Sequence, residues 1–158
     1  MRKATISDIE FVAQCFIELS LFTKSQGSDV YIDGMPSEVN DQTRKLAMQH
    51  IKDDESTVFI STDDEQNSGC IIGKIEETSF PVSNVGKVGK IIICWVSEKY
   101  RRTGIAKRLF TEIEKWFYES GIEIIELSYL SQNGPAKKVW ESLEFEPFRV
   151  FAYKTLNH

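Results

Sequence analysis

The sequence predicts an α/β protein with a central mixed β-sheet flanked by helices on both faces. Short apolar runs rich in β-branched residues, at residues 58–60 and 91–96, are typical of buried strands. After a polar turn, residues 104–117 carry apolar side chains at helical spacing. Hairpin-linked strands combined with one strand–helix–strand crossover require a sheet with both parallel and antiparallel pairs.

The first third of the chain is predicted to be mainly helical. Residues 2–5 form a short edge strand, and Ser7 or Asp8 then caps a helix, because either side chain can accept the free N–H groups of a first turn. Residues 23–35 are polar and predict a loop. A second helix is expected to begin near Pro36, since proline is tolerated in a first turn.

The rest of the chain predicts five strands and two helices. Residues 58–60 and 70–76 form a hairpin around the polar residues 63–69, and residues 80–89 connect it to the strand at 91–96. Gly73 predicts a bulge or a close backbone approach. The helix after Gly104 is followed by a strand at 122–129, a short helix at 136–143 and a last strand at 148–154, where FRVFAYK alternates. We expect residues 1–158 to form a single domain.

Composition and charge narrow the class of protein. The chain has a net charge of -5, and its basic residues form no dominant stripe, which argues against general nucleic-acid binding. No apolar run approaches the roughly 18 residues that span a membrane, and the polar start MRKATISDIE is unlike a secretory signal, so we expect a cytoplasmic protein. The three cysteines lie among apolar residues, which favours reduced core thiols.

Several familiar chemistries have no support in the sequence. It contains no Walker phosphate loop, no dinucleotide-binding glycine motif and no G-x-S-x-G elbow. Only His50 and His158 could serve as imidazole ligands, and no C-x-x-C occurs, so no metal is predicted. We interpret His50, on an apolar helix face, as a structural histidine.

The turn between residues 97 and 104 is the strongest candidate for a site. It links a buried strand to a helix and carries Arg101 and Arg102 before Gly104. The first N–H groups of a helix have no intrahelical acceptor, and the helix dipole favours an anion there. The turn therefore predicts phosphate binding, with surface arginines of an ordinary turn as the alternative.

Two segments resemble the GNAT N-acetyltransferase superfamily. Arg101-Arg102-Thr103-Gly104-Ile105-Ala106 is similar to the Q/R-x-x-G-x-G/A acyl-CoA signature, in the expected strand–turn–helix context. Asn133-x-x-Ala136-x-x-x-Trp140-Glu141-x-x-Glu144-Phe145 resembles the family's N-x-x-A-x-x-x-Y-E-x-x-G-F segment. The order of the elements also fits, so the resemblance covers nearly the whole chain.

The resemblance implies an acetyl-CoA-dependent N-acetyltransferase. The pyrophosphate of coenzyme A would lie on the amides of residues 102–106, with charge from Arg101 and Arg102 and close approach allowed by Gly104 and Ala106. Trp95 and Val96 would pair with the pantetheine arm, and the Val96 N–H would polarise the thioester carbonyl. Asn133 would contact the pantetheine or hold its loop; capping the following helix is the alternative.

Two departures from the family pattern concern the proton transfers. Trp140 replaces the tyrosine that commonly protonates the leaving thiolate, and an indole cannot act as a general acid. Expelling a thiolate at pH 7 costs only about 2 kcal/mol, so the acid is dispensable. Tyr129 could replace the missing tyrosine as the general acid; the alternative is that it is a core residue. Some relatives have a glutamate that acts as the general base at the position of Lys90. The remaining carboxylates that could take this role are Glu76, Glu77 and Asp33, and we name Glu76 as the candidate base.

The predicted activity is transfer of an acetyl group to a primary amine of a small molecule or peptide, by direct attack on the thioester. Residues 23–35 and 76–89 are expected to line the amine pocket. A non-catalytic CoA-binding sensor and a partner-binding domain are the rival functions. Whether the chain forms a homodimer stays open.

Overall fold

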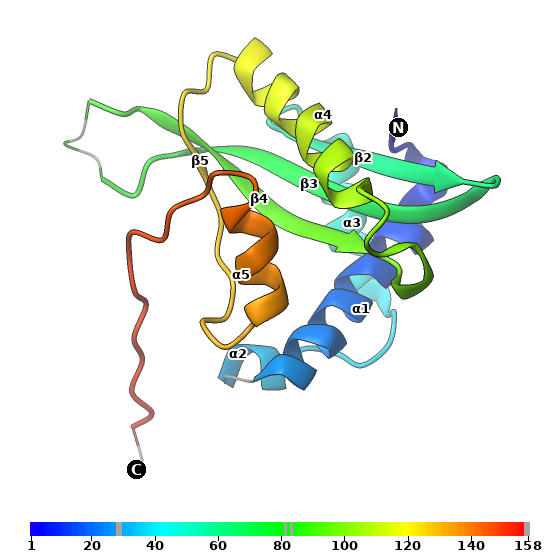
Figure 1. The fold of residues 1–158 in the computed structure, drawn as a ribbon, viewed down its shortest axis with the longest axis horizontal. Helices are drawn as coiled ribbons and strands as arrows, with labels where there is room; N and C mark the ends of the chain where they lie inside the picture. Colours follow the sequence, from blue (N-terminus) through cyan, green and yellow to red (C-terminus); the bar gives the residue numbers. More distant parts are fainter. Residues whose placement is uncertain (28–29, 81, 83, 157–158) are drawn as a thin grey trace.

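The structure is a computed structural model that describes residues 1–27, 30–80, 82 and 84–156, and it is built around one five-stranded sheet (Figure 1). The strands are β1 (Arg2–Lys3), β2 (Ser56–Asp63), β3 (Gln66–Glu77), β4 (Lys87–Val96) and β5 (Ile125–Glu126). The helices are α1 (Ile9–Gln26), α2 (Val30–Asp33), α3 (Asp41–Lys52), α4 (Ile105–Glu119) and α5 (Gly134–Glu141), with short 3-10 turns at Ile6–Asp8 and Glu98–Tyr100.

The strands follow the order β1-β2-β3-β4-β5 across the sheet. The pairs β1–β2, β2–β3 and β3–β4 are antiparallel, whereas β4 and β5 are parallel. The β4–β5 pairing joins only Gly89 to Ile125 and Lys90 to Glu126. Beyond Lys90 the two strands separate, so the sheet is split at one end. The presence of both antiparallel and parallel pairs confirms the predicted mixed sheet.

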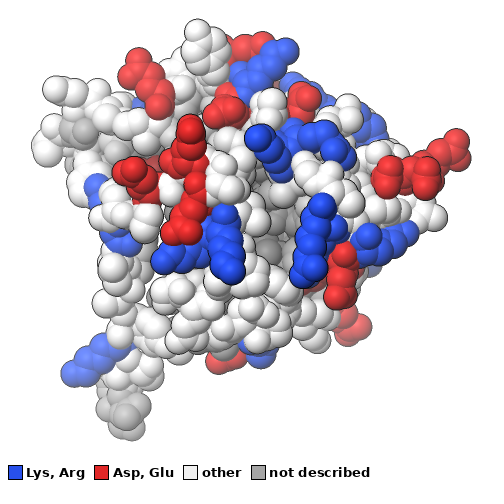
Figure 2. Space-filling model, viewed as in Figure 1, with Lys and Arg blue, Asp and Glu red and all other residues white. Residues whose placement is uncertain are grey.

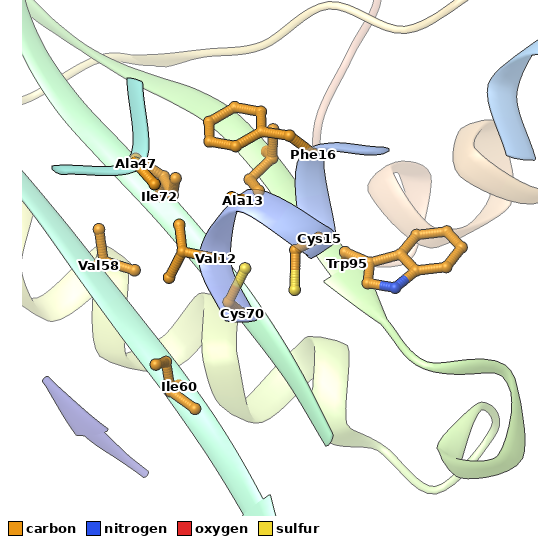
Figure 3. Close-up of a cluster of buried hydrophobic side chains, with 11 residues drawn as sticks. Val12, Ala13, Cys15, Phe16, Ala47, Val58, Ile60, Cys70, Ile72 and Trp95 are labelled. Atoms are coloured by element: carbon orange, nitrogen blue, oxygen red, sulfur yellow. The ribbon is translucent and has the colours of Figure 1, made fainter. Parts of the chain in front are cut away.

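One face of the sheet is covered by α1 and α3. Because side chains alternate along a strand, Val58 and Ile60 of β2 point to this face together with Cys70 and Ile72 of β3. Figure 3 shows these residues meeting Val12, Ala13 and Phe16 of α1 and Ala47 of α3, with Trp95 of β4 at one side. The apolar side of α1, together with Ala47 of α3, is therefore buried against the sheet.

The opposite face packs against α4 and α5. Phe59, Ile71 and Ile91 point to this side and contact Leu109, Ile113 and Phe117 of α4. A Cβ atom built on Gly89 would lie 2.6 Å from Phe117 Cε1, and one on Gly73 would lie 2.7 Å from Ile113 Cγ1. These two glycines let α4 approach the sheet closely, as the position of Gly73 suggested.

The start of the chain is tied to the sheet by an ion pair. Arg2 on β1 donates to both carboxylate oxygens of Asp8 at 2.7 Å, and Thr5 donates its N–H and hydroxyl to the same side chain. These bonds, the Arg2 bond foremost, lower the pKa of buried Asp8 to about 2. Asp8 thus stays ionised and holds the entry to α1.

His50 lies on α3, and its ring is buried. Its Nδ1 lies 3.0 Å from Ser56 Oγ, which in turn donates to the Gly73 carbonyl, and its ring stacks on Phe16. Burial lowers the pKa of His50, so the imidazole is favoured in its neutral form. These contacts agree with a structural role for this residue.

Several element boundaries differ from those predicted. Residues 30–33 form α2 inside the predicted loop, and the second helix begins at Asp41, where the Asn40 side chain accepts the N–H of Thr43. The predicted strand 122–129 shortens to Ile125–Glu126 because β4 diverges from it. The predicted last strand, residues 148–154, is wrong for this structure: it is extended and exposed but pairs with no strand among the described residues.

None of the helices in the described ranges is both long and apolar enough to cross a membrane.

Candidate active site

The candidate site lies where β4 parts from β5. Ser97 donates its N–H to the Ser68 carbonyl of β3 at 2.9 Å. Because backbone groups of successive strand residues point to opposite sides, the N–H and C=O of Val96 face away from β3, toward the edge that β5 leaves open. By the same alternation the backbone groups of Trp95 point to β3, so Val96 is the residue whose N–H can meet a ligand in the split.

A basic turn follows Val96 directly. Arg102 and Gly104 both have left-handed backbone angles, with φ values of 63° and 79°. Thr103 donates its hydroxyl to the Tyr100 carbonyl at 2.6 Å, which closes the turn before α4 begins at Ile105. No side chain caps α4, so its first N–H groups stay available to an anion.

The turn also offers space and positive charge. A Cβ atom on Gly104 would meet only Arg108 Nη1, at 3.7 Å. Arg102, Lys107 and Arg108 are exposed around it. Figure 2 shows Lys and Arg side chains on both sides of a depression on the face that carries α4 and α5, where the α5 lysines are Lys137 and Lys138. This arrangement suits a phosphate-bearing ligand.

Arg101 occupies a different position from the one expected. Its guanidinium lies 4.6 Å from the centre of the Phe22 ring and 4.5 Å from that of Trp95, and its Nε donates to the Val96 carbonyl at 3.1 Å. The side chain is therefore held on the α1 side of the sheet, where it braces the end of β4. The charge that faces the turn comes from Arg102, Lys107 and Arg108 instead.

Trp95 connects this end of β4 to α1. Its indole N–H donates to Glu18 Oε2 at 2.6 Å, and its ring packs against Phe22. Glu18 is half-buried and also accepts from Gln14. Glu18 was missed in the sequence because 77 residues separate it from Trp95 and no local pattern links them. It is a carboxylate that the fold itself brings next to the end of β4.

Glu76 lies at the other end of the sheet. It is paired with Val88 across the β3–β4 ladder, eight residues from Val96, which corresponds to roughly 25 Å along the strand. Lys90 contacts one of its oxygens at 2.7 Å and Lys74 the other at 3.4 Å. The Lys90 bond lowers the pKa of Glu76. Glu76 and Val96 are too far apart to act on the same atom, and this corrects our choice of base.

The C-terminal motif residues serve the packing of α5. Buried Asn133 accepts the N–H of Ala136 at 3.1 Å and so caps α5, as in the alternative considered above. Trp140 is buried edge-on against Phe110 and Phe145. Tyr129 and Ile105 pack against the same apolar cluster, whereas Ala106 is half-buried in the first turn of α4. A contact of Asn133 or Tyr129 with a ligand stays a prediction.

The segments expected to line the amine pocket are described in part. Ser28, Asp29, Pro81 and Ser83 lie outside the described residues. Across the described part of the chain, no three His, Cys, Asp or Glu side chains gather as metal ligands.

An open strand edge beside an uncapped, basic helix N-terminus defines a class of proteins that bind a phosphorylated carrier along a split sheet. Residues 24–145 match the sequence profile of the Acetyltransferase (GNAT) family. The chain therefore belongs to the GNAT acetyltransferase family, whose general activity is acyl-CoA-dependent N-acetylation. No curated protein sequence matches the chain significantly.

Solved structures share the fold along the whole chain. The F44R mutant of the BH1408 protein from Bacillus halodurans superposes with a TM-score of 0.83 at 23% identity, covering 99% of this chain and 98% of that one. An aminoglycoside 6'-N-acetyltransferase from Acinetobacter haemolyticus gives 0.76 at 13% identity, covering 99% and 97%. The aminoglycoside N-acetyltransferase AAC(6')-Iy in complex with CoA gives 0.74 at 17% identity, covering 99% and 98%.

Proposed function

We propose that this protein is an acetyl-CoA-dependent N-acetyltransferase that acetylates a primary amine by direct attack on the thioester. The observation that supports the proposal most strongly is the open edge of β4, which ends at Val96 immediately before the basic turn. A carrier with a phosphate group and an amide-containing arm can use both features at once, the turn for charge and the strand edge for backbone pairing.

The residues present fit coenzyme A. The N–H groups of residues 102–106 and the side chains of Arg102, Lys107 and Arg108 would hold its pyrophosphate, and the open space at Gly104 admits close approach. When bound, acetyl-CoA supplies the acetyl thioester that the amine attacks. The protein's own contribution is then orientation and electrostatic stabilisation at the end of β4.

The Val96 N–H is the electrophilic group of the proposed site. Directed into the split, it would donate a hydrogen bond to the thioester carbonyl oxygen, where negative charge develops. One such preorganised donor is worth about 3–4 kcal/mol of barrier in other acyl-transfer enzymes. Arg101 supports this role, because its bond to the Val96 carbonyl fixes the orientation of the same residue's backbone.

Glu18 replaces Glu76 as the proposed acceptor of the amine proton. An alkylammonium group at pH 7 must lose a proton before attack, at a cost of about 4–5 kcal/mol. A half-buried carboxylate beside Trp95 can attract the ammonium form, orient it toward the end of β4 and receive its proton. The leaving thiolate needs no acid, which is consistent with Trp140 being packed in the core.

The function is tested by measuring free-thiol release from acetyl-CoA in the presence of a panel of amines. The panel should include polyamines, amino sugars, amino acids, peptides and, because neighbouring structures are aminoglycoside acetyltransferases, aminoglycosides. We expect amine-dependent release with at least one class. Tight CoA binding without release would indicate a sensor instead, and no thermal shift with CoA would indicate a partner-binding domain.

A further inference from the structure

Two side chains of opposite charge contact the Trp95 indole at the end of β4. The Glu18 carboxylate of α1 accepts the indole N–H at 2.6 Å, and the Arg101 guanidinium lies 4.5 Å from the centre of the same ring. The ring is buried at one side of the apolar cluster and is held there by packing (Figure 3). One rigid side chain thus fixes a negative and a positive group beside the proposed reacting centre at Val96.

Neither charge is neutralised by another charge in the part of the chain that the structure describes. Glu18 and Arg101 take part in none of the ion pairs among these residues. Glu18 accepts hydrogen bonds from two neutral groups, the Trp95 indole and the Gln14 amide. Both charged side chains are half-buried, so a ligand can still reach them. A partly desolvated charge without a counter-charge is costly, and a ligand that supplies one would remove that cost.

The Arg101 guanidinium has donors that the fold does not use. Its Nε–H donates to the Val96 carbonyl, whereas its terminal nitrogens, Nη1 and Nη2, have no acceptor among the described residues. The bond to Val96 alone does not require a guanidinium, because the amide nitrogen of a glutamine is also attached to Cδ and would occupy the position of Nε. What the arginine adds is a positive, planar pair of donors, the geometry that a carboxylate accepts with both oxygens.

We propose that Arg101 binds the carboxylate of the acceptor substrate while Glu18 binds its ammonium group, so that the substrate class is free amino acids. This inference rests on the proposed N-acetyltransferase function. Because one indole holds both groups, the two charges of the ligand must be only a few bonds apart, as they are in an α-amino acid. Arg101 is then a specificity-determining residue, and the phosphates of the cosubstrate are left to Arg102, Lys107 and Arg108 on the turn.

The proton balance of the reaction is compatible with this arrangement. The substrate ammonium gives one proton to Glu18, and its nitrogen bonds to the acetyl carbon as the carbon–sulfur bond breaks. Of the two remaining protons on nitrogen, one stays on the amide product and the other passes through water to the expelled thiolate. The substrate carboxylate takes no part in the chemistry, so its contact with Arg101 serves binding and orientation.

The first test measures free-thiol release from acetyl-CoA by the full chain with the standard amino acids, and then compares the best of them with its carboxamide. We expect release with at least one amino acid, and a kcat/KM at least about tenfold lower for the carboxamide, which lacks the charged partner of Arg101. Release only with amines that carry no carboxylate would overturn this inference and leave the proposed function standing. No release with any amine would overturn the proposed function, and the inference with it.

The second test assigns the selectivity to Arg101 by comparing kcat/KM for the same amino acid and carboxamide in two variants. Arg101→Gln retains a donor for the Val96 carbonyl but removes the charge and the terminal nitrogens, and it should bring the ratio down by about tenfold or more. Arg102→Gln is the matched control: it removes the neighbouring charge on the cosubstrate side and should leave the ratio unchanged. Each ratio is taken within one protein, so a change in stability or in cosubstrate binding cancels. An unchanged ratio in Arg101→Gln would show that Arg101 only braces β4.

Discussion

Asp8 links the stability of the protein to pH through its ion pair with Arg2. Its pKa is depressed to about 2 by Arg2 and Thr5, so its contribution is fully present above the pKa of a free aspartate, near 4, and is lost as pH falls through about 2. We expect Asp8→Asn to lower the free energy of unfolding by about 1–2 kcal/mol at pH 7. Urea denaturation should show this difference shrinking between about pH 4 and pH 2. A difference independent of pH would contradict the ion pair.

Glu18 is the residue on which the proposed proton transfer rests. Glu18→Gln keeps an acceptor for the Trp95 indole N–H, so stability should change little. The amine-dependent kcat/KM at pH 7 should fall by about 100-fold or more, the range of a lost general base. The loss should shrink as pH approaches the amine pKa, where the nucleophile is already neutral.

Glu10→Gln is a suitable control, since Glu10 lies on the same helix but is paired with Arg44 on the surface. Equal rates for Glu18→Gln and the natural protein across the pH range would exclude Glu18 as the proton acceptor.

The sequence identifies candidate site residues more reliably than it identifies the side chains that they contact in the folded protein. Arg101 and Arg102 are adjacent in one motif, yet only Arg102 remains at the turn, because Phe22 and Trp95 stack on Arg101. Glu76 is a candidate base from the sequence because its strand neighbours the central strand, but strand register places it far from Val96. Such outcomes depend on pairings between distant segments, which leave no local pattern.

At the level of elements, the proposed binding of CoA phosphates at the start of α4 can be tested by one substitution. Gly104→Glu places a carboxylate against the expected phosphates and should abolish the thermal stabilisation of the protein by CoA. Gly121→Glu is a matched control, because Gly121 also has a positive φ, 74°, and an open surrounding, at the far end of the same helix. Retained CoA binding in Gly104→Glu would mean that the phosphates lie elsewhere.

The packing of α4 on the sheet makes a second prediction. Gly89→Ala drives a methyl group into Phe117 and should lower the free energy of unfolding by about 1–3 kcal/mol, as overpacked cores do. Gly86→Ala, which meets nothing within 4 Å, should be close to neutral. Urea denaturation of both variants makes the comparison. Similar stabilities would show that α4 stands further from β4 than the structure places it.

Strands and helices with a buried apolar face could be predicted from the sequence, whereas exposed or very short elements could not. The strands at 58–60, 70–76 and 91–96 were found because their apolar runs are covered on both faces by helices. Residues 148–154 alternate just as clearly, but alternation shows only that a segment suits strand pairing, and here the segment pairs with no strand among the described residues. Residues 30–33 make only one helical turn, which is too short for a helical spacing of apolar residues to show in the sequence.

At the level of the whole molecule, the three thiols lie in or against the apolar core. Cys15 and Cys70 are buried between α1 and β3, where contact with Cys15 and burial raise the pKa of Cys70, and burial raises the pKa of Cys94 to about 12. A thiol reagent at neutral pH should therefore label the native protein slowly and all three cysteines after denaturation. Rapid labelling of the native protein would show that this core opens readily.

The brief pairing of β5 with β4 also bears on how a long ligand can enter and leave. β2, β3 and β4 are joined by long ladders, each with one register shift, whereas two residue pairs hold β5 to β4. Regions tied by few backbone bonds open at lower free energy than the rest of a domain. The β4 side of the split in the sheet is then rigid and keeps Val96 in place. The β5 side can yield, so exchange of the proposed cosubstrate would leave the proposed reacting centre at Val96 intact.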